Sequence, residues 1–117
     1  MTEILYDREN LKISLTGHTG AGEYGKDLVC AAVSILAQTL ERRLTDEAEH
    51  FLPAVEKKPG RMMIFCRAEE EPEERCRDIF DTVFVGFTLL AETYPQFVSA
   101  AVTGEADDAE REDDGNE

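Results

Sequence analysis

The sequence predicts an α+β fold in which two helices pack on a mixed or antiparallel sheet, as a sandwich with the element order ββαββαβ. In several short segments apolar residues alternate with polar ones, which is typical of half-buried strands. Two longer segments carry apolar residues at three- and four-residue steps, which is typical of helices with one buried face. The 117 residues are enough for one domain with a single core.

The first half of the chain is predicted to hold a hairpin, a loop and a helix. Residues 4–6 and 11–15 have the two-residue period of strands, with turn residues at 7–10 between them. Residues 16–25 contain four of the eight glycines, so we expect a flexible loop there, formed around Gly17, Gly20, Gly22 and Gly25. From Lys26 to about Leu44 the apolar residues cover a broad helical face.

The second half is predicted to hold two strands, a helix and a last strand. Residues 51–55 have a weak strand pattern, residues 57–60 form a turn, and residues 61–68 form the next strand. The acids and proline at 69–74 are typical of a helix start, and apolar residues then follow at helical steps as far as Tyr94. Pro95 ends this helix, and residues 98–102 form the last strand.

The C-terminal segment differs in composition from the rest of the chain. Residues 104–117 hold eight acidic residues and one basic residue, and they carry half of the formal net charge of −14. Such a segment cannot bury enough apolar surface to fold. We therefore expect one domain over residues 1–103, followed by a disordered acidic tail over residues 104–117.

The composition argues against several classes of function. An acidic exterior repels phosphate backbones, so we expect no direct binding of nucleic acid and favour basic protein or peptide partners. No apolar run reaches the roughly 20 residues of a membrane span. The first residues also lack the features of a signal peptide, so we expect no membrane association and a cytoplasmic protein. The three cysteines are separated by 36 and 10 residues, which fits neither a disulfide framework nor a zinc site, and we expect no metal or cofactor.

A histidine and a cysteine flank the glycine-rich loop. His18 follows the second predicted strand, and Cys30 falls in the first turn of the predicted helix. A helix start lowers the pKa of a thiol because its unpaired amides and its dipole favour the thiolate. His18 could then deprotonate Cys30 and later protonate a leaving amine, while the amides of the helix start offer an oxyanion hole. The alternative is a buried cysteine and a loop histidine that only satisfies a carbonyl.

This stretch resembles the hallmark motif of the ribosomal-processing cysteine protease Prp family. The motif joins Gly-His, a glycine-rich spacer and a run that contains V-C-A-x-x-S. This chain carries Gly17-His18 and then GKDLVCAAVS at positions 25–34. Thr19 stands where alanine is common. The likeness of motif is confined to residues 13–40, and elsewhere it is one of length and element order.

The resemblance implies both the site and the substrate. His18 and Cys30 correspond to the catalytic dyad, and the loop between them gates the substrate. Family members resemble homodimeric endopeptidases that remove a short N-terminal extension from the precursor of the twenty-seventh protein of the large ribosomal subunit. That substrate is a basic ribosomal protein, which an acidic enzyme would attract electrostatically.

Two neighbours of Cys30 are predicted to support it. Asp27 could cap the helix, or it could orient the imidazole of His18 as the third member of a triad. Ser34 lies one turn after Cys30, where its hydroxyl could bond a helix carbonyl or contact the thiolate.

Other interpretations compete with the protease. Residues 20–26 have the spelling of a phosphate-binding loop, but Asp27 stands where a serine or threonine is needed and Glu23 adds a repulsive charge. A non-enzymatic ribosome-assembly factor would bind a basic ribosomal protein and have an inert Cys30. A thiol redox sensor would form a sulfenic acid or a mixed disulfide at Cys30. We expect Cys66 and Cys76 to be packing residues and His50 to be solvated.

Overall fold

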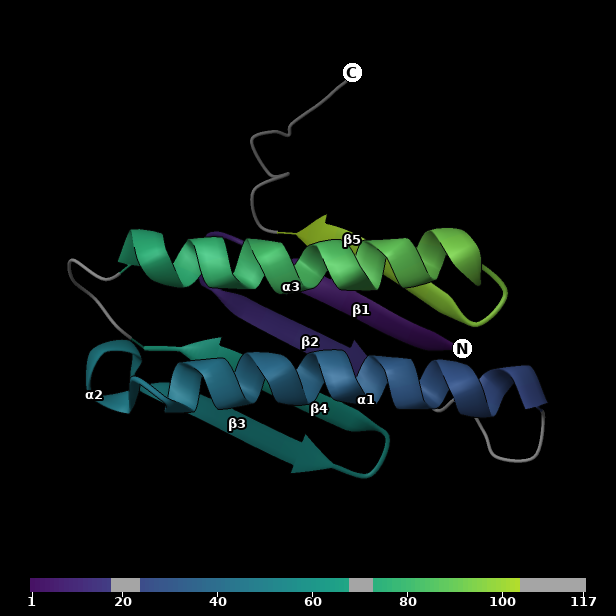
Figure 1. Cartoon of the computed structure of the whole chain (residues 1–117), viewed down its shortest axis with the longest axis horizontal. Coiled ribbons are helices and arrows are strands. Elements are labelled where there is room, and N and C mark those ends of the chain that lie inside the picture. Colours follow the sequence, from purple (N-terminus) through teal and green to yellow (C-terminus); the bar gives the residue numbers. More distant parts are fainter. Residues whose placement is uncertain (18–23, 68–72, 104–117) are drawn as a thin grey trace, which may run out of the picture.

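The computed structural model describes residues 1–17, 24–67 and 73–103. Over these residues a five-stranded mixed sheet carries two long helices on one face, which confirms the predicted fold class (Figure 1). The elements are β1 (Thr2–Asp7), β2 (Lys12–Thr16), α1 (Tyr24–Thr45), α2 (Ala48–Phe51), β3 (Pro53–Lys58), β4 (Arg61–Cys66), α3 (Glu73–Thr93) and β5 (Val98–Thr103).

The sheet has the strand order β3-β4-β2-β1-β5. All neighbours are antiparallel except β1 and β5, which run parallel. The predicted hairpin is confirmed, with Ile4 opposite Leu15 and Tyr6 opposite Ile13. Its turn is held by Asp7, whose carboxylate accepts hydrogen bonds from the backbone and the side chain of Asn10 at 3.2 and 2.9 Å.

The core lies between the sheet and the two long helices. Alternate strand residues point toward the helices because successive side chains of a strand face opposite sides of the sheet. The core residues that α3 contributes are spaced at helical steps, which is the pattern that predicted this helix: Cys76, Phe80, Val83 and Phe87. In the part of the chain that the structure describes, no helix is long and apolar enough to cross a membrane.

The helices α1 and α3 run antiparallel and pack against each other (Figure 1). Gly86 on α3 lies at their contact, where an added Cβ would come within 2.8 Å of Leu36 on α1. The absence of a side chain at Gly86 therefore lets the two helices approach closely. On the sheet, α1 lies over the β3–β4 side and α3 lies over β5.

Several boundaries differ from the sequence predictions. The helix α1 begins at Tyr24 rather than at Lys26. The short helix α2 was not predicted, and it includes Phe51, which the sequence had assigned to a strand. Lys57 and Lys58 belong to β3 and not to the turn, so the turn before β4 consists of Pro59 and Gly60. The pattern failed here because Lys57 and Lys58 extend a strand beyond its apolar part. The tail at 104–117 lies outside the described residues.

Candidate active site

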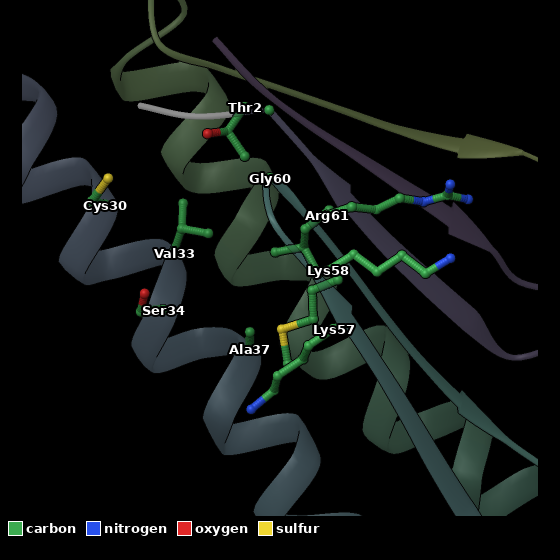
Figure 2. Close-up of a pocket in the computed structure, with 12 residues that line it drawn as sticks. Thr2, Cys30, Val33, Ser34, Ala37, Lys57, Lys58, Gly60 and Arg61 are labelled. Atoms are coloured by element: carbon green, nitrogen blue, oxygen red, sulfur yellow. The ribbon is translucent and has the colours of Figure 1, made fainter. Parts of the chain in front are cut away.

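Cys30 lies on α1, beside a cleft of about 350 Å³ between this helix and the sheet. Figure 2 shows the helix wall of the cleft, where Cys30, Val33, Ser34 and Ala37 follow one another along α1. The opposite wall comes from the start of β1, the end of β2 and the hairpin between β3 and β4. Four separate stretches of sequence therefore build this cleft.

The cleft combines an apolar lining with a thiol. Leu15, Val33, Ala37 and Met62 line it, and each of them belongs to the core or packs against it. Cys30 is partly exposed there. Apolar walls with few polar groups are typical of sites that bind the side chains of a ligand.

Gly17 fixes the end of β2 at the rim of the cleft. Its backbone φ is +108°, which residues with a Cβ rarely adopt, and a Cβ there would collide with the carbonyl oxygen of Met1. Its N–H donates a hydrogen bond of 2.8 Å to the carbonyl of Gly60 in the β3–β4 turn. The chain thus leaves the sheet beside Cys30, and His18 is the next residue along it.

The structure brings together only some of the predicted site residues. Cys30, Ser34 and Gly17 line one cleft, as the motif led us to expect. His18, Gly20 and Gly22 lie outside the described residues. Asp27 lies in the first turn of α1, but its side chain is not described. The placement of these residues relative to Cys30 therefore stays a prediction.

The position of Cys30 in its helix differs from the prediction. Because α1 begins at Tyr24, Cys30 is its seventh residue and lies in the second turn. Only the first four amides of a helix lack an intrahelical partner, so the amide of Cys30 is not among them. Gly25 was predicted to lie in the glycine loop, and it is instead the second residue of α1. The unpartnered helix amides therefore precede Cys30 by about one turn.

The other two cysteines are packing residues, as predicted. Cys76 is fully buried, and Cys66 is buried with its Sγ 2.7 Å from the carbonyl oxygen of Phe51. His50 is exposed on α2, as predicted. Among the described residues no group of three or more His, Cys, Asp or Glu side chains could hold a metal ion.

The sequence did not indicate that Lys57 belongs to the cleft. Lys57 pairs with Met62 across β3 and β4, and Met62 packs against the core, so both side chains lie on the helix-facing side of the sheet. Lys58 and Arg61 pair with each other, and in Figure 2 their side chains point away from α1. Val55 and Lys57 are two residues apart, so they face the same side of a strand. This spacing could have placed Lys57 on the helix-facing side if the predicted strand had included the two lysines.

The sequence model of the family described as "Cysteine protease Prp" matches residues 1–99. The chain belongs to the cysteine protease Prp family. The resemblance drawn from the motif is thereby confirmed, and the protein is a cysteine protease. No curated protein sequence matches this chain significantly.

Solved structures support the same fold. The crystal structure of SMU.848 from Streptococcus mutans is 31% identical, with a TM-score of 0.65, and the match covers 86% of this chain and 90% of that chain. The essential ribosomal processing protease Prp from S. aureus, in complex with a covalently linked product peptide, is 21% identical, with a TM-score of 0.68. That match covers 87% of this chain and 97% of the S. aureus chain. The same protease has also been solved with a substrate peptide, at 20% identity and a TM-score of 0.68 over the same shares of the two chains.

Proposed function

We propose that this Prp-family protease uses Cys30 as its nucleophile and His18 as its acid–base partner. The observation that carries the proposal is the setting of Cys30. Among the three thiols it alone lines the cleft, and the cleft is bordered by Gly17, the residue before His18. A cysteine protease needs a thiol in a cleft and an imidazole to exchange protons with it, and His18 follows Gly17 directly in the sequence.

The proposed reaction is acyl transfer in two steps. The Cys30 thiolate attacks the carbonyl carbon of the scissile bond, and the resulting oxyanion collapses with cleavage of the C–N bond as His18 protonates the leaving amine. Water then attacks the thioester with His18 as the base, which releases the new carboxylate and restores the thiol. Ser34, exposed in the cleft one turn after Cys30, could support the thiolate, and Asp27 could cap α1 or orient His18.

The proposed substrate is the precursor of the twenty-seventh protein of the large ribosomal subunit, from which the enzyme removes an N-terminal extension. The similar S. aureus protein is described as a ribosomal processing protease and binds a substrate peptide. The net charge of −14 supports a basic partner, because opposite net charges speed encounter. The glycine loop that begins at Gly17 would gate the cleft. We place this activity in the cytoplasm.

We further propose that the active form is a homodimer. Four large aliphatic side chains on the outer side of the helix layer are each more than half exposed, namely Leu28, Ile35, Val85 and Leu89. Because α1 and α3 run antiparallel, Arg42 and Asp78 lie toward the same end of the layer. A twofold axis parallel to the helices would place Arg42 of each copy opposite Asp78 of the other, which makes this face complementary to itself.

The test is processing of the precursor ribosomal protein by the purified enzyme, followed by mass spectrometry. Wild-type protein should yield a product shortened at its N-terminus. Cys30→Ala and Cys30→Ser should abolish cleavage while circular dichroism shows an intact fold, because each change is small. His18→Ala should also inactivate the enzyme.

Asp27→Asn separates the two roles of Asp27 in the same assay. Asparagine caps a helix as well as aspartate does, so a mild loss identifies a cap and a severe loss identifies an orienting group. Full activity of a folded Cys30→Ala protein would contradict the proposed mechanism. If neither wild type nor any variant cleaves the precursor, but the protein binds it stably, the result would favour the assembly factor instead.

A further inference from the structure

The cleft has a thiol at one end and an ammonium group at the other. Figure 2 shows Cys30 at the upper end of the helix wall and the side chain of Lys57 reaching toward α1 beyond Ala37. The other lining residues are largely apolar, with the hydroxyl groups of Thr2 and Ser34 among them. Lys57 comes from the edge strand β3 and reaches the helix-facing side through its register opposite Met62.

The ammonium group of Lys57 is held only loosely. Its Nζ lies 3.9 Å from Oε1 of Glu41 on α1, which is the outer limit of an ion pair. The Lys57 side chain is 63% exposed, whereas that of Glu41 is 33% exposed. Exposed pairs of this kind contribute little to stability. A ligand in the cleft would therefore meet the lysine more readily than the glutamate, and the lysine could turn to it at low cost.

Neighbouring cations strengthen the positive character of this end of the cleft. Lys58 and Arg61 follow on the same hairpin and point away from α1 (Figure 2). Both residues border the cleft, but their side chains extend away from α1, so they act there through their charges, which add to the local potential. Within a strongly acidic protein, this end of the cleft is thus suited to a negative group.

The length of the cleft sets which substrate residue would reach Lys57. Ala37 and Glu41 lie seven and eleven residues after Cys30, which is about 10 and 16 Å along a helix that rises 1.5 Å per residue. An extended peptide advances about 3.3 Å per residue. A peptide whose scissile carbonyl lies at Cys30 would therefore bring a side chain three to five residues away close to Lys57.

We propose that Lys57 is a specificity-determining residue that binds an acidic side chain of the substrate, three to five residues from the scissile bond. This inference rests on the proposed function, because it takes Cys30 as the point of cleavage. Glu41 is the resting partner of Lys57, and the substrate carboxylate takes its place when the peptide binds. The basic character of the whole substrate and an acidic residue at this one position are compatible, because steering acts at long range and Lys57 acts at contact distance.

The test uses peptides that span the processing site, with Glu, Gln or Lys substituted in turn at the third, fourth and fifth residue on each side of the scissile bond. The measured quantities are KM in cleavage and the Kd for the Cys30→Ala protein by fluorescence anisotropy. At one position wild type should bind the Glu peptide about two- to five-fold more tightly than the Gln peptide, as expected for a partly exposed ion pair. Lys57→Glu should reverse the order and favour the Lys peptide.

Lys58→Glu is the matched control, because it makes the same change of charge one residue away with its side chain on the other face of β3. The Lys58→Glu variant should keep the preference of wild type for the Glu peptide. The Lys57→Met variant should lose this preference. No preference at any position, or an equal effect of Lys57→Glu and Lys58→Glu, would overturn the inference. Charge-dependent binding to the Cys30→Ala protein without cleavage by wild type would contradict the proposed function while supporting the role of Lys57.

Discussion

Three cysteines of the same chemical type lie in three different environments in this protein. Cys76 is inaccessible in the core, Cys66 is buried against the carbonyl of Phe51, and Cys30 is partly exposed at the cleft. Reaction of a thiol with a small electrophile requires both access and the thiolate form. Exposure alone therefore separates Cys30 from the other two before any effect of His18 is added.

We expect iodoacetamide to alkylate Cys30 near neutral pH much faster than Cys66 or Cys76. Peptide mapping by mass spectrometry after short exposures would measure the three rates. Labelling in denaturant, where all three thiols are accessible, is the control. Equal rates in the folded protein, or modification of Cys30 only after unfolding, would contradict both the geometry of the cleft and the role of Cys30.

At the scale of elements, a polar cluster joins β1 to α3 on the side of the molecule away from Cys30. The Asp81 carboxylate accepts hydrogen bonds from the hydroxyl of Tyr6 at 2.6 Å and from the Arg8 guanidinium at 3.0 Å on each oxygen. Burial and the hydrogen bond to Asp81 hold the pKa of Tyr6 far above its usual range. Burial alone would raise the pKa of Asp81, but the hydrogen bonds from Arg8 and Tyr6 outweigh it and lower that pKa.

The lowered pKa of Asp81 predicts how stability changes with pH. A carboxyl whose pKa is lower in the folded state stabilises that state fully above its unfolded pKa, about 4, and loses this contribution as the pH falls through the folded value. Asp81→Asn should therefore reduce the free energy of unfolding at pH 7 by on the order of 1 kcal/mol, since the side chain is about a third exposed. Between pH 5 and pH 2 the difference from wild type should shrink.

Urea unfolding at several pH values would measure this effect. Glu3→Gln is the control, because Glu3 is an exposed carboxylate on β1, the strand of Tyr6, and lies away from the proposed dimer face. Its stability should follow that of wild type throughout. A constant difference between Asp81→Asn and wild type over the whole pH range would show that the charge of Asp81 is not what stabilises the cluster.

At the scale of the whole molecule, the exposed aliphatic side chains on the outer side of α1 and α3 are the feature that indicates an interface with another protein. Each of the four is between 55% and 59% exposed. Single exposed apolar residues are normal on soluble proteins, but a group of this kind on one face is typical of an interface. Because the residues of α1 and α3 that cover the sheet are buried, these exposed residues lie on the other side of the two helices.

We expect light scattering to find a dimer at micromolar concentration, and the double substitution Ile35→Glu with Val85→Glu to make it monomeric. Two carboxylates of each copy would have to be buried near the carboxylates of the other copy. The free-energy cost of this burial is far larger than the gain from the apolar contact. Leu52→Glu is the control, because Leu52 is also an exposed aliphatic residue but lies after α2. A wild-type monomer that cleaves the precursor at full rate would contradict the dimer.

The sequence by itself determined most of the elements and the family. The hairpin, both long helices and the last strand are visible because a two- or three-to-four-residue period is a local property that each segment carries alone. The pairing of Gly17-His18 with Cys30 also lies within one short stretch, which is why the family could be recognised. The roles of Cys66 and Cys76 followed from their positions in apolar patterns, and burial confirms them.

Only the tertiary structure decided where the cleft lies and what borders it. The cleft exists because β1, the end of β2, α1 and the β3–β4 hairpin meet, and their contacts join residues far apart in the sequence. The direction of Lys57 depends on the register of β3 against β4, since a shift by one residue would exchange it with Lys58. The sequence pattern cannot predict this register, because the residues concerned are all charged. At an exposed strand end, water can solvate a lysine side chain on either face of the sheet.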